Sequence, residues 1–399
     1  MRKVVSVSSD VRPLTGVKVL DMSQILAGPY CTRLLADAGA EVTKVEPPMG
    51  DPSRQLPARI GENHSGYFVW LNCGKKSVVA DLNTEEGRDL VKALAADADV
   101  LVENMRPGSL DNKGLGFAEL SRLNPGLIMC SISAFGHTGV FAGRAGQGII
   151  AEGWSGAIDM NGSADGPPLP LGVSLADVSA GIHAYGAIVT ALYRRDHVDG
   201  IGENIDVSLF EAALPFHETA FEEVELGDAH TNPTRNGAEH RSVVPYGVYE
   251  APGGYMTIAA GTERLWARFA EVLSKALGPA EHDLSTNDLR VEHRAYVREL
   301  IERWAAHIGS RDQALDVLAE AGIPSGPIEQ VRDVAKGELA VSREAFVTIP
   351  DHVLGHVSVL ATPYKTRNSR IGPVGPAPRL GEHTEHVATS LGLLTDSPR

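Results

Sequence analysis

The sequence predicts an α/β protein whose large domain is built on a Rossmann-like parallel sheet, accompanied by a smaller α+β domain. Two observations lead to this fold class. Short apolar runs alternate with helical patterns along the first third of the chain, which is the rhythm of βαβ units. The chain also has 399 residues, more than one hydrophobic core usually serves, so two structural units are expected.

The predicted elements of the large domain begin with the strand VKVLDM (17–22), a helix over 29–37 and the strand EVTKVE (41–46). The alternation then continues with a helix over EEGRDLVKALAAD (85–97) and strands over DVLVE (99–103) and LIMCSI (127–132). A longer helical pattern covers about 178–195, and Asp177 directly precedes it. Ligands of such sheets bind beyond the carboxyl ends of the strands, so we expect a site there.

The domain organisation follows from changes in pattern along the chain. The polar segment EEVELGDAHTNPTRNGAEHRS indicates a connection. A hairpin around Gly253-Gly254 and helices over 263–276, 289–307 and 311–321 then indicate a second unit. The last segment is rich in Gly and Pro, which favours extended chain packed on another core. The expected divisions are a large domain (1–215), a linker (216–240), a small domain (241–325) and a linker with a C-terminal segment (326–399).

Composition narrows the function classes. A formal net charge of −15 disfavours nucleic acid and anionic membranes as partners. No run approaches the ~18 to 20 consecutive apolar residues of a transmembrane helix, and the start lacks the apolar centre of a secretory signal. Cys31, Cys73 and Cys130 have no CxxC spacing, so we interpret them as reduced packing residues. We expect a soluble cytoplasmic enzyme.

Several common catalytic motifs are missing from the sequence. Gly74-Lys75-Lys76-Ser77 does not complete a P-loop, and no GxGxxG fingerprint or GxSxG elbow is present. His383 and His386 have the spacing of a ligand pair but no HExxH glutamate or second cluster, so no metal site is predicted.

The segment LTGVKVLDMSQILAGPYCTRLLADAGAEVTKVEPPMGDPSR (14–54) closely resembles the opening of class III CoA-transferases, the formyl-CoA and carnitine CoA-transferase family. Further matching segments follow in the same order over nearly the entire chain: LNCGKKSVVADL (71–82), VENMRPGSLDNKGLG (102–116), SISAFGHTG (131–139), LADVSAG (175–181), IDVSLFEA (205–212), GIPSGPI (322–328) and APRLGEHT (377–384). The resemblance implies a homodimer of interlocked rings. It also implies that the N-terminal half and the C-terminal tail together build the large domain.

The resemblance implies that Asp177, in LADVSAG, is the catalytic nucleophile and that a coenzyme A thioester is the substrate, with no permanently bound cofactor. A carboxylate suits this chemistry, because it is ionised at neutral pH and attacks a thioester without a base, giving a reactive mixed anhydride. The helix that follows Asp177 places N–H groups and a dipole near its charge. By position alone, an Asp before a helix is usually an N-cap.

CoA is anionic, so an acidic chain must gather its basic residues around it. The matching family segments supply a set of expected CoA contacts: Lys75, Lys76, Asn104, Arg106, Lys113 and Phe135. The expected substrate pocket comprises Ile25, Leu26, Ala27, Gly136 and Gln147. The acceptor is expected to be a small carboxylic acid.

Two departures from the formyl-CoA transferases bear on the acid. Their run of several glycines in the second domain is absent here, and Leu26 stands where they have a glutamine before AGP. We therefore expect a larger or partly apolar acid, such as a branched or unsaturated dicarboxylate.

Two alternative functions remain open. The 2-methylacyl-CoA racemases share the family's ancestry and need an acid and a base facing each other. Their histidine falls where this chain has Gln147, which cannot take a proton. A non-catalytic CoA-binding protein is the other alternative, and the presence of Asp177 argues against it.

Overall fold

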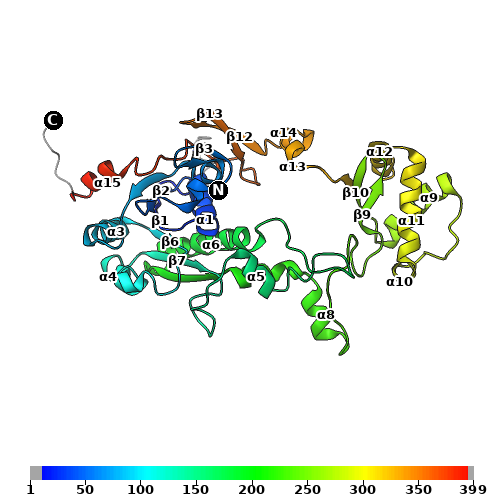
Figure 1. Cartoon of the computed structure of the whole chain (residues 1–399), viewed down its shortest axis with the longest axis horizontal. Coiled ribbons are helices and arrows are strands. Elements are labelled where there is room, and N and C mark those ends of the chain that lie inside the picture. Colours follow the sequence, from blue (N-terminus) through cyan, green and yellow to red (C-terminus); the bar gives the residue numbers. More distant parts are fainter. Residues whose placement is uncertain (1–10, 394–399) are drawn as a thin grey trace, which may run out of the picture. The chain divides into compact units, whose positions relative to one another are not determined.

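The computed structural model describes residues 11–393, which divide into two compact units (Figure 1). Unit 1 contains the described residues of 1–157, 171–219 and 338–399, and unit 2 contains 158–170 and 220–337. The chain therefore leaves unit 1 twice and returns to it twice. The excursion at 158–170 had no signal in the sequence pattern.

A parallel sheet of six strands forms the centre of unit 1, in the order β5-β2-β1-β6-β7-β8. Its strands are β1 (Lys18–Asp21), β2 (Glu41–Glu46), β5 (Lys76–Val79), β6 (Val100–Glu103), β7 (Ile128–Ser133) and β8 (Glu203–Ser208). The strand order reverses between β1 and β6, so the crevice at their carboxyl ends is the expected place for a ligand. The predicted parallel α/β sheet is confirmed.

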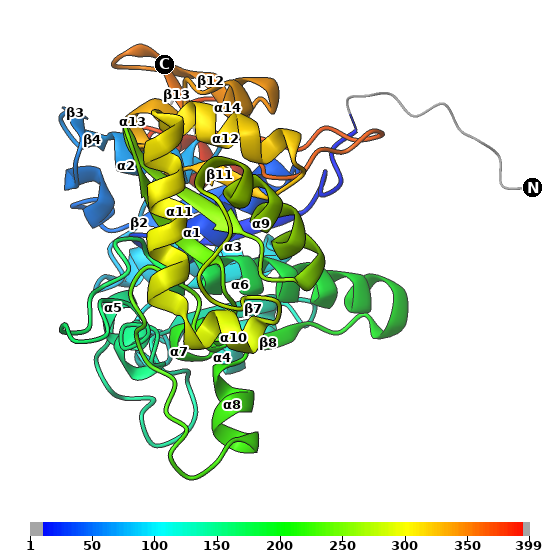
Figure 2. The ribbon, with the colours of Figure 1, turned by 90° about the vertical axis from the view of Figure 1, so that its right-hand side faces the viewer.

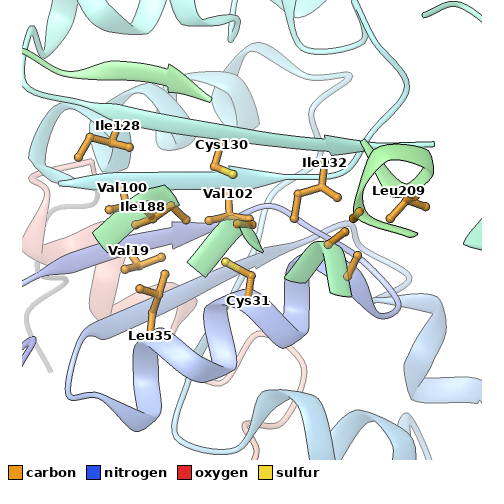
Figure 3. Close-up of a cluster of buried hydrophobic side chains, with 14 of the residues drawn as sticks. Val19, Cys31, Leu35, Val100, Val102, Ile128, Cys130, Ile132, Ile188 and Leu209 are labelled. Carbon is orange, nitrogen blue, oxygen red and sulfur yellow. The ribbon is translucent and has the colours of Figure 1, made fainter. Parts of the chain in front are cut away.

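Helices cover both faces of this sheet. Alternate residues of each strand point to opposite faces, so Val19 belongs to the core with α1 and α6, whereas Leu20 belongs to the core with α3 and α4 (Figure 3 shows the first core). The helices of unit 1 are α1 (Ala27–Asp37), α2 (Gly66–Asn72), α3 (Glu85–Asp97), α4 (Phe117–Leu123), α5 (Gly148–Trp154), α6 (Leu175–Arg194), α7 (Leu209–Ala213), α14 (Glu338–Ser342) and α15 (Thr384–Ser390).

Local sequence accounts for where several of these helices begin. Ser65 caps α2 and Thr84 caps α3, each through a side-chain oxygen that accepts a backbone N–H of the first turn. Glu85 and Glu86 follow in α3, where carboxylates complement the positive helix end.

Helix α6 is the one described helix that is long and apolar enough to cross a membrane by length and composition. Its buried residues pack on the sheet and against α1, which is the placement of a core helix. Cys31 and Cys130 lie in the same core, and all three cysteines are free and buried, as predicted.

The C-terminal segment of unit 1 packs on its N-terminal half. The hairpin of β12 (Phe346–Asp351) and β13 (Gly355–Leu360) shares a small core with α2 through Ile349, Val359 and Phe68. Farther along, His383 and Thr384 hydrogen-bond to the edge strand β5. The short hairpin of β3 (Arg59–Gly61) and β4 (His64–Ser65) completes the unit.

Unit 2 has its own core, formed where an antiparallel sheet packs on helices (Figure 2). The sheet order is β11-β10-β9, and the predicted hairpin lies between β9 and β10, with Gly253 in its turn at φ 94°. The elements are α8 (Ala220–Leu226), β9 (Tyr246–Ala251), β10 (Gly254–Ala259), α9 (Glu263–Leu277), α10 (Asn287–Glu292), α11 (Arg294–Ile308), α12 (Arg311–Glu320), β11 (Ser325–Pro327) and α13 (Val331–Val334).

Candidate active site

Asp177 lies at the carboxyl edge of the sheet, in the first turn of α6. The opposite end of α6 is tied to the amino edge, because Arg195 forms an ion pair of 2.9 Å with Asp99, which precedes β6. A helix of 20 residues is about 30 Å long, so its first turn reaches the other edge. Because α6 begins at Leu175, Asp177 is its third residue. The sequence prediction that Asp177 precedes the helix is therefore wrong.

The carboxylate of Asp177 is packed against Gly148, the first residue of α5. A Cβ on residue 148 would collide with Oδ2 of Asp177, so the carboxylate can take this position only beside glycine. Gln147 is the N-cap of α5 and is exposed, which places it next to the same carboxylate. Phe135 comes close as well, because it lies against Gly146 and packs on Trp154 at the end of α5.

A second carboxylate, Glu152, lies near Asp177. Glu152 is buried, and its Oε1 accepts the backbone N–H of Ala176 at 3.2 Å. Burial and the negative charge of Glu152 together raise the pKa of Asp177 to about 6. The two carboxylates therefore make Asp177 a less acidic group than an ordinary Asp, while it stays mostly ionised at neutral pH.

Tyr67, in α2, is a phenol whose pKa responds to the charge of Asp177. Burial raises its pKa to about 12, with further contributions from the charges of Asp177 and Asp51. The hydroxyl therefore remains protonated at all physiological pH values. A protonated phenol can donate a hydrogen bond to an oxyanion that forms within its reach.

The loop after β1 is held by three polar side chains, of which Asp51 and Lys44 are buried and Asn104 is partly buried. Asn104 pairs with the backbone of Gln24, accepting its N–H at 2.7 Å and donating to its carbonyl at 2.8 Å. Asp51 accepts the N–H of Ile25 at 3.3 Å, and Lys44 donates to the carbonyl of Ser23 at 2.6 Å.

This binding holds Ile25 in a left-handed conformation, at φ 68°. A β-branched residue rarely adopts this geometry, and a strained backbone residue typically marks a functional site. The strain keeps the side chain of Ile25 exposed, whereas Leu26 and Ala27 are buried.

The same loop approaches Asp177 through the packing of α1 on α6. A Cβ at Gly181 would meet the carbonyl oxygen of Ala27 at 2.7 Å, so the two helices touch one turn after Asp177. Strand β7 pairs with β6, and Gly136 lies in the turn that follows β7, at φ 81°. Asp206 fixes this turn by accepting the N–H of His137 at 2.8 Å. Segments from β1, β6 and β7 thus converge on one edge.

Comparison with known proteins gives the site its context. The family described as CoA-transferase family III matches this chain over residues 14–384. The succinyl-CoA–D-citramalate CoA-transferase of Chloroflexus aurantiacus is 34% identical over 388 residues, covering 96% of this chain and 95% of that protein. The chain belongs to CoA-transferase family III.

Two further family members agree over similar lengths. The succinyl-CoA:glutarate CoA-transferase of Mus musculus is 34% identical over 381 residues, covering 94% of this chain and 86% of that protein. The crystal structure of a CAIB/BAIF family protein from Brucella suis superposes with a TM-score of 0.84 at 35% identity, covering 95% of this chain and 99% of that chain. The protein is thus a CoA-transferase, an enzyme that moves CoA between an acyl-CoA and a carboxylic acid.

The predicted CoA contacts of this transferase fall into two groups. Arg106 and Lys113 follow β6 and lie at the same edge as Asp177. Lys113 also donates to Asn83 at 3.0 Å, which ties together the loops after β6 and β5. Both cations remain candidates for the phosphates of CoA.

The structure places the other two predicted lysines elsewhere. The ammonium of Lys75 is buried and donates to Asp21, Asn72, Thr32 and the Pro29 carbonyl, at 2.7–3.0 Å. Lys76 is the first residue of β5, at the amino edge, where it pairs with Glu41 at 3.5 Å. These placements argue against the phosphate contacts that the resemblance implied for both residues.

Sequence reasoning missed Glu152 and Tyr67. Glu152 had a signal, because it is the single charge within the apolar run GIIAEGW of a short helix, and a charge in such a run needs a reason. Tyr67 had none, since an aromatic residue in an apolar helix usually belongs to the core. Asn104 was predicted to contact CoA, and its amide holds the Gln24 peptide; its contact with CoA stays a prediction.

Proposed function

We propose that this enzyme transfers CoA between dicarboxylic acids through covalent intermediates on Asp177. The observation that carries the proposal is the carboxylate of Asp177, partly buried at the start of α6 beside Gly148, with its pKa raised by burial and by the charge of Glu152. Relatives named for succinyl-CoA with D-citramalate or with glutarate support a dicarboxylate as the acid.

The reaction follows from carboxylate chemistry. The Asp177 carboxylate attacks the thioester carbonyl, which forms an aspartyl-acyl anhydride and releases CoA as thiolate. The thiolate then attacks the aspartyl carbonyl, which frees the first acid and leaves an aspartyl-CoA thioester. The carboxylate of the second acid repeats these two steps in reverse order, so the new acyl-CoA departs and Asp177 is restored.

The surrounding groups assist this cycle in distinct ways. The positive end of the α6 dipole and the Tyr67 hydroxyl stabilise the negative charge of the tetrahedral states, since the N–H groups of Leu175, Ala176 and Val178 already have acceptors. The raised pKa of Asp177 makes its carboxylate more nucleophilic than an ordinary Asp, because basicity and nucleophilicity rise together.

Two experiments test this function. The protein is incubated in deuterated water with succinyl-CoA, a 2-methylacyl-CoA and a pool of mono- and dicarboxylic acids, and every acyl-CoA is identified by mass spectrometry. New dicarboxylyl-CoA species without deuterium at the α carbon support transfer. Deuterium in the 2-methylacyl-CoA without new thioesters would instead establish a racemase.

Trapping of the intermediate identifies the nucleophile. After incubation with succinyl-CoA alone, hydroxylamine converts an aspartyl anhydride or thioester into a hydroxamate, which changes the mass of the peptide that contains Asp177. The Asp177→Asn variant should show no such peptide. A hydroxamate on another residue, or none in the active enzyme, would contradict the proposed intermediate.

The interlocked dimer is part of the same proposal. The chain order supports it, because a chain that leaves unit 1, builds unit 2 and returns to unit 1 is a closed loop. Linked rings cannot exchange without unfolding. Two differently tagged preparations should therefore form no mixed dimers in native buffer but should do so after joint unfolding and refolding, and an active monomer would disprove the link. The cytoplasmic location stays a prediction.

A further inference from the structure

A cluster of three possible metal ligands lies in unit 1, apart from the catalytic residues. His64 belongs to β4, Asp351 ends β12, and His352 follows it in the turn to β13. One ligand atom from each residue lies within 4.8 Å of those of the other two. The cluster joins segments that are 287 residues apart in sequence.

The inner part of the cluster is rigid and buried. The side chains of His64 and Asp351 are 1% and 0% exposed, and Nε2 of His64 lies 2.8 Å from Oδ2 of Asp351. The other carboxylate oxygen, Oδ1, accepts the backbone N–H groups of Val353 at 2.9 Å and Leu354 at 2.8 Å. These bonds fix the orientation of the carboxylate before any ligand arrives.

One atom of this buried pair has no hydrogen-bond partner within the described chain. It is Nδ1 of His64. Leaving a buried polar atom unsatisfied is costly, so such an atom in a native fold usually has a partner that the protein chain does not supply. The ring of His352 lies 4.1 Å from the His64 ring, between centroids, and its own side chain is exposed.

We propose that His64, through its unpartnered Nδ1, and His352 bind one divalent transition-metal ion, with Zn²⁺ as the ion of best fit, while Asp351 orients the His64 ring through Nε2. Imidazole nitrogens are donors that suit Zn²⁺, and the exposed side of His352 leaves positions for water. Tetrahedral Zn²⁺ with bonds of about 2.0–2.2 Å requires donor atoms roughly 3.3–3.5 Å apart. Rotation of the exposed His352 can bring one of its ring nitrogens to this spacing from Nδ1 of His64, while Nε2 of His64 keeps its 2.8 Å contact with Asp351.

This site goes beyond the sequence prediction, in which no metal was expected. His383 and His386 have the spacing of a ligand pair, but Nδ1 of His383 accepts the N–H of Ser77 at 3.2 Å and is therefore already occupied. The proposed ligands are too far apart in sequence to form a motif. The metal would link His64 in β4 to the C-terminal hairpin and so fix the returning segment on unit 1. His64 lies three residues before Tyr67 in the sequence.

The experiment measures Zn²⁺ binding to the full chain after treatment with a chelator, by equilibrium dialysis with elemental analysis. Wild type should bind one Zn²⁺ per chain. Zn²⁺ should also raise the midpoint of thermal unfolding. The His352→Ala variant should bind at least tenfold more weakly while keeping the His64–Asp351 pair and therefore its fold. Co²⁺ in place of Zn²⁺ should give visible absorption bands of a tetrahedral site, and these should vanish in the same variant.

His356→Ala is the matched control. His356 is exposed on β13 and pairs with Pro350, the neighbour of Asp351, so it lies on the opposite face of the hairpin. Its loss should leave stoichiometry and affinity unchanged. Absence of saturable binding in wild type, or equal binding in His352→Ala, would overturn the proposal. Neither result depends on transfer activity, so the proposed function stands or falls separately.

Discussion

Replacing Glu152 by glutamine isolates the charge that helps to raise the pKa of Asp177. Glutamine keeps an oxygen that can accept the Ala176 N–H, so the first turn of α6 stays in place. The negative charge disappears, and the pKa of Asp177 must fall. Burial, which is the larger cause of the raised value, remains, so the pKa stays above that of an ordinary Asp.

The size of the effect follows from the ionised fraction. With a pKa of about 6, roughly 9% of Asp177 is ionised at pH 5 and about 91% at pH 7. Transfer therefore falls as the pH drops through 6. If the substitution lowers the pKa by about one unit, roughly half is ionised at pH 5. Through the ionised fraction alone, activity relative to wild type rises about fivefold at pH 5 and about a tenth at pH 7, so the variant-to-wild-type ratio is about fivefold higher at pH 5 than at pH 7 whatever nucleophilicity the variant loses.

The assay is the pH profile of kcat/KM between about pH 4.5 and 8, at constant ionic strength, with the ratio of variant to wild type taken at each pH. The ratio cancels the ionisation of the acid substrate. Glu119→Gln, a change of an exposed carboxylate in α4, is the control and should give a flat ratio. An acid limb that does not move, or moves to higher pH, would refute the coupling between the two carboxylates.

Three further predictions follow from the same contacts. Asp177→Asn should lower kcat by at least about 10³-fold and should raise the free energy of unfolding at pH 7. The pKa rise of about 2 units, from 3.8 to about 6, limits this gain in unfolding free energy to about 3 kcal/mol, and partial exposure reduces it to about 1–2 kcal/mol. Urea titrations should show the gain shrinking as the pH falls through 6, because Asp177 of the wild type is then protonated and its buried charge no longer costs stability. Asp51→Asn should cost about 3–5 kcal/mol of unfolding free energy, because it leaves buried Lys44 without its 2.9 Å partner. Tyr67→Phe should lower kcat about tenfold with little change in KM in steady-state assays.

Each of these has an outcome that would contradict it. A stability gain in Asp177→Asn that is the same at pH 4 and pH 7 would show that ionisation is not its cause. For the buried pair, Lys76→Ala removes an exposed pair and should cost less than about 1 kcal/mol, and an equal loss in both variants would contradict the role of burial. Unchanged kcat in Tyr67→Phe would remove the hydroxyl from the mechanism.

The sequence by itself determined the order of the main elements of the parallel sheet and named the residue that we propose as nucleophile. Alternation of apolar runs is a local property of the backbone, so β2 was predicted with its observed bounds, and α1 and β6 within two residues. The segment LADVSAG pointed to Asp177 because a family motif is a short run of residues, which can be recognised without knowing the fold. The start of α6 was misplaced by three residues, since helix ends depend on capping contacts more than on periodicity.

Only the tertiary structure decided which charges lie near Asp177. Lys75 and Lys76 are neighbours in sequence, yet one ammonium is buried with Asp21 and the other lies at the amino edge of the sheet. The charge of Glu152, from another helix, raises the pKa of Asp177, and Asp351 reaches His64 from the returning segment. Burial and distance arise when elements far apart in the chain pack together, and both the pKa of a carboxylate and the partners of an imidazole depend on them.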